Sequence, residues 1–352
     1  MTVMYKKAFA LLSGGLDSAL AVKMILDQGV EIEAVNFMSP FCNCTPKTAG
    51  CKNQARKLAD EFGIKIRVIP KGMDYMKMVE RPPHGYGRGM NPCIDCRIYM
   101  LRKVREMMTA EDVSFVITGE VLGQRPMSQH RRAIELIEKE GGLSGLILRP
   151  LSAKYFEPTV PEQEGIVDRD KLLALSGRSR KPQIELAEKL GITDYPCPAG
   201  GCLLTDREIA ARLRDLFLHR PDYTMADLHL LKLGRHFRID PGLKIIVGRN
   251  QAENEQVKRQ AGPEDAVFRP LNFRGPTVLA QGALSPALEQ TIGQIVARYC
   301  QDEPDNYRMG KRVRTIEETE FNVEGRFSPE RLEEMRIGEA GVDFCRPLEC
   351  AR

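Results

Sequence analysis

The feature that most constrains the fold is a six-residue stretch, Ser13-Gly14-Gly15-Leu16-Asp17-Ser18. It follows the apolar run Ala8–Leu12 and precedes Ala19–Leu26, a segment rich in apolar residues. This order predicts a buried strand, a tight glycine turn and a helix. Glycines let backbone N–H groups approach an anion closely, and a helix N-terminus adds the positive end of its dipole. We therefore expect an anion-binding loop between a strand and a helix.

The side chains of this loop favour a nucleotide triphosphate as the anion. The stretch lacks the lysine of a Walker A loop, which argues against a P-loop kinase or GTPase. The Ser13 and Ser18 hydroxyls can donate to phosphate oxygens, and Asp17 can hold a magnesium ion. We expect ATP to bind at Ser13, Gly14, Gly15, Asp17 and Ser18, with Mg²⁺ as a cofactor. The alternative is an ordinary glycine turn between a strand and a helix.

The loop resembles the PP-loop of the ATP pyrophosphatase superfamily. That resemblance implies adenylation of a carbonyl or carboxylate oxygen, release of pyrophosphate, and displacement of AMP by a nucleophile. It leaves the acceptor and the nucleophile open.

Composition sets the size and setting of the protein. A chain of 352 residues that is 42% hydrophobic can form two domains. The net charge is only +4, so RNA contact would have to come from local basic patches. No apolar run approaches twenty residues and no signal-peptide pattern is present, so we expect a cytoplasmic protein without membrane contact.

The first half of the chain alternates strand and helix patterns, which predicts an α/β fold with a doubly wound, mostly parallel sheet. Ligands then bind beyond the carboxyl ends of the strands, where Met38 is expected to lie near adenine. The segment Ser152–Ser176 fits the alternation poorly and is interpreted as an insertion or lid. The expected strands are Phe9–Leu12, Ile32–Phe37, Ile66–Ile69, Phe115–Thr118 and Leu146–Arg149. The expected helices are Ser18–Gln28, Lys52–Phe62, Ile94–Met108, Ser128–Lys139 and Gln183–Leu190.

A second, smaller α+β domain is expected after about Thr224. We place the nucleotide-binding domain at residues 1–220, the second domain at 224–340 and a tail at 341–352. The sequence leaves the structure of the charged segment after Asn306 undefined. The expected elements are strands at 233–239, 243–250, 266–269 and 277–281, and helices at 253–260 and 286–300.

The ten cysteines favour thiol chemistry, because a cytoplasmic chain seldom uses disulfides. Cys93 and Cys96 form a C-x-x-C pair at a helix start, where backbone dipoles lower thiol pKa values. Cys202 and Cys197 lie in a loop rich in proline and glycine. Cys93, Cys96 and Cys202 could ligate a [4Fe–4S] cluster with one open iron. Structural zinc, with Cys197 as a fourth ligand, and a catalytic persulfide are the alternatives. Cys42, Cys44 and Cys51 form a further group that is either a metal site or a loop staple.

The stretch Thr118–Gln129, with the sequence TGEVLGQRPMSQ, resembles a segment of tRNA 4-thiouridine synthetases. In that family it borders the nucleotide and the target base, which implies ATP contacts for Thr118, Gly119 and Gln124. The stretch Asn91–Cys96 resembles the segment of tRNA 2-thiouridine synthetases that carries a catalytic cysteine. In that family a second cysteine lies in a later loop, so the resemblance implies catalytic roles for Cys96 and Cys202. Asp17 in the PP-loop is the third residue expected to be catalytic.

Two segments of the second domain, Gly234–Phe237 and Ile246–Asn254, resemble the NFACT RNA-binding domain. The resemblance implies phosphate contacts for Arg235, Arg249 and Arg274, and stacking of His236 and Phe237 on bases. The alternative is that the arginine and asparagine residues only fix a turn, while Phe237 packs in the core. Such a domain would replace the N-terminal RNA-binding domain of 4-thiouridine synthetases, for which the chain leaves no room.

Together the resemblances imply an ATP-dependent tRNA sulfurtransferase that adenylates a uridine carbonyl oxygen and replaces it with sulfur. The sulfur would come from a cluster or a persulfide, supplied by free sulfide or a cysteine desulfurase. Two alternatives stay open: a sulfur or amide transferase acting on a small molecule, and a non-catalytic protein that binds RNA, ATP and metal.

Overall fold

The computed structural model describes residues 6–42, 51–195, 201–300, 304–313 and 317–338. The chain divides into two compact units, residues 1–203 and 204–352. Each unit is considered by itself below.

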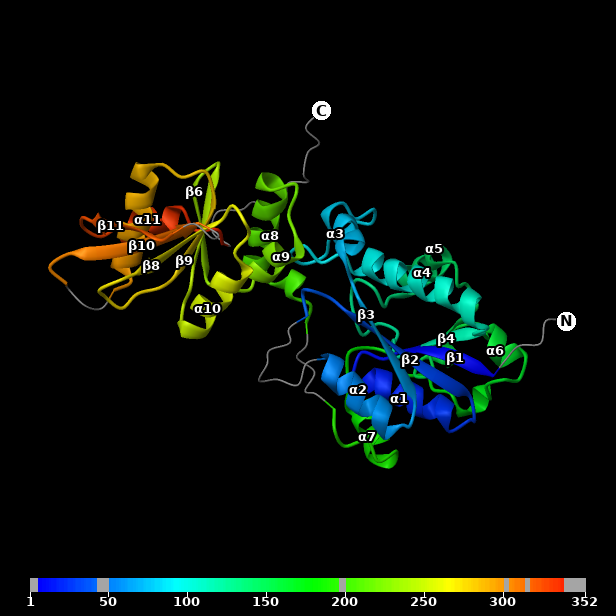
Figure 1. The fold of residues 1–352 in the computed structure, drawn as a ribbon. Helices are drawn as coiled ribbons and strands as arrows, with labels where there is room; N and C mark the ends of the chain where they lie inside the picture. Colours follow the sequence, from blue (N-terminus) through cyan, green and yellow to red (C-terminus); the bar gives the residue numbers. More distant parts are fainter. Residues whose placement is uncertain (1–5, 43–50, 196–200, 301–303, 314–316, 339–352) are drawn as a thin grey trace. The chain divides into compact units, whose positions relative to one another are not determined.

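The first unit is built on a five-stranded parallel sheet with the order β3-β2-β1-β4-β5 (Figure 1). The parallel pairing and the alternation of strands with helices confirm the α/β fold expected from the sequence. The strands are β1 (Lys7–Leu11), β2 (Glu31–Met38), β3 (Lys65–Pro70), β4 (Phe115–Thr118) and β5 (Ile147–Leu148).

Helices cover both faces of this sheet, as a parallel sheet requires. On one face, α1 (Leu16–Leu26), α2 (Cys51–Glu61) and α7 (Lys181–Lys189) pack on β-strand residues such as Ala10 and Ile117. On the other face, α4 (Cys93–Glu111) and α5 (Arg131–Gly141) pack on Phe9 and Val116. Neighbouring strand residues thus enter different cores, which explains why each strand is apolar throughout.

The second unit holds a six-stranded antiparallel sheet with the order β11-β10-β8-β9-β7-β6. This arrangement confirms the predicted α+β domain. The strands are β6 (Arg235–Asp240), β7 (Leu243–Val247), β8 (Ala266–Pro270), β9 (Val278–Gly282), β10 (Tyr307–Val313) and β11 (Thr319–Val323).

Helices flank this second sheet too. Helix α11 (Pro286–Arg298) contributes Val296 to the larger core, which also contains Phe237 of β6. Helices α9 (Met225–Leu230) and α10 (Gln251–Gln260) form a smaller core with Ile246 and Leu279. Helix α8 (Arg207–His219) precedes α9 in the same unit.

Some elements were not predicted. The segment after Asn306, which the sequence left undefined, forms β10, β11 and α12 (Pro329–Glu334). Helices α3 (Met73–Glu80) and α8 were also missed. The segment 152–176 contains only short helical turns and α6 (Val160–Gln163). Within the described residues, no helix has the length and apolar character needed to cross a membrane.

Candidate functional site

The candidate residues of the first unit gather at the carboxyl edge of the parallel sheet. Ser13 follows β1, Met38 ends β2, Lys71 follows β3 and Thr118 ends β4. Because neighbouring parallel strands end at one edge, these positions lie around a common site, as expected for ligands of open α/β sheets. Met38 is half-buried, and its carbonyl accepts a hydrogen bond from the Lys71 N–H at 2.8 Å.

The glycine loop joins β1 to α1 as predicted. Gly14 has a φ of 83°, a conformation that glycine adopts without strain. The Ser18 hydroxyl donates to the Gly15 carbonyl at 2.8 Å and lies 3.1 Å from the Ser13 hydroxyl. The two serine hydroxyls therefore converge at the start of α1, where the helix dipole favours an anion.

Asp17, in the first turn of α1, is fixed from two sides. Its Oδ2 accepts a hydrogen bond from Gln124 Nε2 at 2.8 Å and lies 3.5 Å from Arg180 Nη2. Its Oδ1 is buried and has no hydrogen-bond partner among the described residues. An unsatisfied buried carboxylate oxygen is costly, and it matches the oxygen ligand that Mg²⁺ prefers. The residues present therefore fit a magnesium ion at Asp17.

Gly119 brings the second motif against the PP-loop. A Cβ atom at Gly119 would lie 2.5 Å from the carbonyl carbon of Asp17 and 2.5 Å from the backbone nitrogen of Ser18. No real Cβ tolerates such a contact, and the opposing atoms belong to a backbone that cannot rotate away. Only glycine allows this approach, so the TGE stretch and the PP-loop form one backbone-to-backbone contact.

A buried ion-pair network supports this contact from behind. Glu120 accepts from Arg149 Nε at 3.0 Å and lies 3.5 Å from Arg97 Nε. The Thr118 hydroxyl also donates to Glu120, at 3.4 Å. Burial alone would raise the pKa of the Glu120 carboxyl, but the charges of Arg97 and Arg149 lower it. Glu120 is therefore a carboxylate that holds the loop in place.

Cys96 has a cationic partner that the sequence analysis missed. Lys71, which is itself buried, donates to the Cys96 sulfur at 3.0 Å, and the Tyr75 hydroxyl lies 3.6 Å from it. Burial would raise the pKa of the Cys96 thiol, but the charge and hydrogen bond of Lys71 lower it below its usual value. Lys71 therefore favours the thiolate form of Cys96.

The other two candidate cysteines differ from Cys96. Burial raises the pKa of the Cys93 thiol, whose sulfur accepts a hydrogen bond from Asn91 at 3.0 Å. Cys202 lies close to Tyr75, because the charges of both Cys96 and Cys202 help to raise the pKa of that phenol, after burial. A hydrogen bond from the Leu203 N–H to the Phe41 carbonyl anchors the chain beside Cys202. Cys96 and Cys202 are thus brought to one tyrosine.

Among the described residues, Cys93, Cys96 and Cys202 do not form a set of metal ligands. Within the described ranges, no three His, Cys, Asp or Glu side chains are placed to hold a metal ion. Cys197 and Cys44 lie outside the described residues, and the Cys51 side chain is not described. The ammonium group bonded to Cys96 suits a reactive thiolate better than a sulfur shared with iron or zinc.

Arg125 links the two halves of the site. It comes from the same TGEVLGQR stretch and is exposed. Its charge interacts with Cys93 and Asp17, and with the guanidinium groups of Arg97 and Arg180. The PP-loop carboxylate and the cysteine pair are therefore connected through a cluster of arginines, a setting that favours polyanionic substrates.

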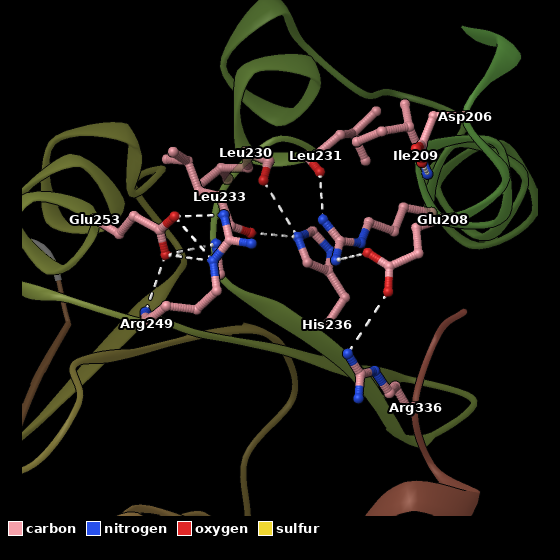
Figure 2. A network of polar contacts seen from close by, with 12 residues as sticks. Asp206, Glu208, Ile209, Leu230, Leu231, Leu233, His236, Arg249, Glu253 and Arg336 are labelled. Atoms are coloured by element: carbon pink, nitrogen blue, oxygen red, sulfur yellow. Dashed lines mark hydrogen bonds and ion pairs between the residues drawn. The ribbon is translucent and has the colours of Figure 1, made fainter. Parts of the chain in front are cut away.

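The three predicted RNA contacts of the second unit lie in different environments. Arg249 is tied to Glu253 by hydrogen bonds at 2.9 and 3.0 Å (Figure 2). Arg235 lies over the Tyr299 ring, 5.0 Å from its centroid. Arg274 is exposed and makes no hydrogen bond or ion pair with any described residue.

The expected stacking of His236 and Phe237 on bases is wrong. Both side chains are 1% exposed. His236 Nε2 lies 2.9 Å from the Leu233 carbonyl and 3.2 Å from that of Leu230 (Figure 2). Burial holds the pKa of His236 well below its usual value, so the ring is neutral. The alternative interpretation for Phe237, that it packs in the core, is confirmed.

The strand, glycine loop and helix at the carboxyl edge of the parallel sheet have the arrangement expected of a PP-loop, and the family comparison agrees. Residues 4–155 match the family model described as thiamine biosynthesis protein (ThiI), and residues 234–334 match that of the NFACT protein RNA binding domain. These two matches confirm both resemblances seen in the sequence.

Curated relatives match the PP-loop part. A protein of Anoxybacillus flavithermus named probable tRNA sulfurtransferase is 28% identical over 199 residues, covering 48% of this chain and 49% of the relative. One of the same name from Geobacillus kaustophilus is 32% identical over 146 residues, covering 41% and 34%. The chain thus spans half or less of these relatives. A solved 4-thiouridine synthetase in complex with RNA and ATP is 24% identical, covers 53% of this chain and 51% of that one, and has a TM-score of 0.34.

Proposed function

We propose that this protein is an ATP-dependent tRNA sulfurtransferase that replaces a uridine carbonyl oxygen with sulfur. The observation that carries the proposal is the meeting of two chemistries at one sheet edge. The PP-loop and the stretch around Gly119 supply a triphosphate site, and Lys71 supplies a thiolate at Cys96. The names of the curated relatives and the RNA-binding domain support tRNA as the acceptor.

In the first half-reaction, the uridine carbonyl oxygen attacks the α-phosphorus of ATP and pyrophosphate leaves. Backbone N–H groups of Gly14 and Gly15 and the hydroxyls of Ser13 and Ser18 hold the phosphates. Arg125 and Arg180 balance their charge. A magnesium ion at Asp17 would neutralise the charge on the leaving pyrophosphate. Met38, Thr118 and Gln124 complete the site, with Gln124 orienting Asp17.

In the second half-reaction, sulfur displaces AMP. We propose that the terminal sulfur of a Cys202 persulfide attacks the activated carbon and expels AMP. The Cys96 thiolate then attacks the sulfur of Cys202, which frees the thiouridine and leaves a Cys96–Cys202 disulfide. A dithiol reductant restores both thiols. The shared neighbour Tyr75 and the lowered pKa of Cys96 support these two roles. The terminal sulfur of the persulfide would come from a cysteine desulfurase. Alternatively, free sulfide would attack Cys202 in the Cys96–Cys202 disulfide, which gives the Cys202 persulfide and frees the Cys96 thiol.

The test is to incubate the purified chain with ATP, unmodified tRNA and a sulfur source. Pyrophosphate release and the tRNA nucleosides are then measured, the latter by mass spectrometry. We expect pyrophosphate release that depends on tRNA, together with a thiolated uridine. Cys96→Ser and Cys202→Ser should abolish thiolation, whereas Cys300→Ser, in the other unit, should not. Pyrophosphate release that never responds to tRNA would refute the proposal and favour a small-molecule acceptor.

A further inference from the structure

A half-buried tyrosine, Tyr299, lies where α11 ends in the second unit. The guanidinium of Arg235 lies over its ring, 5.0 Å from the centroid. Arg235 is the first residue of β6 and shares a sheet face with Phe237, because alternate strand residues point to the same side. Since Phe237 belongs to the core under α11, the Arg235–Tyr299 pair lies at the margin of that core.

Further charges surround this tyrosine. Burial raises the pKa of the Tyr299 phenol, and the charges of Arg235, Arg336 and Arg298 oppose that rise. Glu333 acts on the phenol in the opposite direction. Arg235 thus lies over the ring, and the charges of Arg298 and Arg336 also act on the phenol.

Only part of this positive charge is neutralised inside the unit. Arg336 lies 3.6 Å from Glu208 (Figure 2), and it also lies 3.2 Å from Glu333. Arg235 and Arg298 make no hydrogen bond or ion pair with any residue of the described part of the chain. Two guanidinium groups thus remain available beside Tyr299, in contrast to Arg249, which is occupied by Glu253.

This chemistry fits a single-stranded nucleic acid. Guanidinium groups bind phosphates, and an aromatic ring offers a stacking surface that any unpaired base can use. A base paired inside a duplex keeps its faces stacked on its neighbours, so Tyr299 would be of no use to it.

We propose that Arg235, Arg298 and Tyr299 bind an unpaired segment of RNA, with the arginines on phosphates and a base extending the Arg235–Tyr299 stack. This inference rests on the proposed function, in which tRNA is the substrate. It adds to that function the surface that binds the RNA, and the preference of this surface for unpaired nucleotides.

The test measures binding of a labelled uridine oligonucleotide to the full chain by fluorescence anisotropy, without ATP, at several salt concentrations. Tyr299→Ala should weaken binding about 5- to 100-fold, the range of one lost stacking contact, whereas Tyr299→Phe should keep it. Arg298→Ala should weaken binding and reduce the salt slope by about 0.7, the value for one phosphate contact on a single strand. The matched control is Arg308→Ala on β10, which removes a guanidinium paired with Glu320.

Each outcome decides the matter. Loss of oligonucleotide binding in Tyr299→Ala and Arg298→Ala, with Arg308→Ala unaffected, supports the site. If Tyr299→Ala fails to fold, its binding cannot be compared with that of wild type. The salt dependence of oligonucleotide binding by Arg298→Ala then decides between the outcomes. Wild-type binding that neither variant weakens overturns the surface but leaves the proposed function standing. A wild-type chain that binds neither the oligonucleotide nor tRNA overturns both.

Discussion

A methyl group at Gly119 would overlap the backbone of Asp17 and Ser18. We predict that Gly119→Ala separates the TGE stretch from the PP-loop and lowers ATP-dependent pyrophosphate release at least about tenfold, because loss of orientation at a reacting centre is costly. Gly338→Ala is the control, since a Cβ there meets no atom within 4 Å. Equal rates for the two variants would contradict the contact.

Lys71 gives a second prediction at this scale. Because Lys71 lowers the pKa of Cys96, Lys71→Met should raise that pKa and slow alkylation of Cys96 near neutral pH. The measurement is the pH profile of iodoacetamide labelling at Cys96, followed by mass spectrometry. Lys77→Met on α3, the helix that follows Lys71, is the control, because Lys77 is exposed. An unchanged profile in Lys71→Met would show that the lysine does not activate the thiol.

Residues inside a motif could be predicted, and isolated residues could not. The sequence pointed to Gly119 and Gln124 because they belong to one stretch with a recognisable pattern. Lys71 stands alone, and its one signal was its place directly after the predicted strand Ile66–Ile69. His236 and Phe237 were given an RNA-binding role because a single sequence cannot show that a side chain is buried.

At the scale of elements, the loop between α3 and α4 is tied down by His84. Its Nδ1 lies 2.8 Å from Asp95 Oδ1, and its Nε2 lies 3.1 Å from Glu140 Oε1. The hydrogen bond with Asp95, against the opposing effect of burial, raises the pKa of His84 above its usual 6.5. Asp95 lies between Cys93 and Cys96, so this loop is joined to the first turn of α4.

The raised pKa sets the sign of a pH dependence. The His84 contacts contribute stability that is fully present below the unfolded pKa of about 6.5 and is lost as the pH rises through the folded pKa. We predict that His84→Gln lowers the melting temperature more at about pH 6 than at about pH 9. A melting-temperature difference between His84→Gln and wild type that grows with pH would contradict this.

A second element prediction concerns the buried charges that join α8 to β6 and β7. Asp215 lies 2.7 Å from Arg238 Nη2 and 3.0 Å from Lys244 Nζ, and the Lys244 side chain is only 5% exposed. Asp215→Asn leaves this ammonium without a counter-charge, so we predict a loss of about 3–5 kcal/mol in the unfolding free energy of the second unit. Urea unfolding followed by circular dichroism measures it, with the exposed Asp222→Asn as control.

The elements that were missed share a physical cause. The predicted strands are apolar runs, because the parallel sheet buries both faces. Strand β11 lies at the edge of its sheet, and only Val323 of its five residues is buried. In β10, the buried Met309 and Gly310 are flanked by charged residues on either side rather than forming an apolar run. Strand β10 also pairs with β8, which precedes β9 and α11 in the sequence, and a local pattern does not show such a pairing.

At the scale of the whole molecule, the sequence predicted both fold classes because each domain carries its own pattern. The PP-loop and its strand–helix alternation predict the parallel unit, and the hairpin around Asp240 and Gly242 predicts the antiparallel one. The meeting of Cys96 with Lys71 and Tyr75 required the folded sheet, because these residues are carried by different elements.

The pairing of residues 335–337 with β6 also has a consequence for the molecule as a whole. The Arg238 N–H donates to the Met335 carbonyl, and the Ile337 N–H donates to the His236 carbonyl, each at 2.9 Å. Strand β6 is an edge strand of its sheet, and the unpaired backbone groups of an edge strand can pair with a strand of another chain. Residues 335–337 cover this edge, and we predict that they prevent self-association of the protein through β6. Ending the chain at Glu334 should produce concentration-dependent aggregates by light scattering, whereas a chain ending at Gly338 should stay monodisperse.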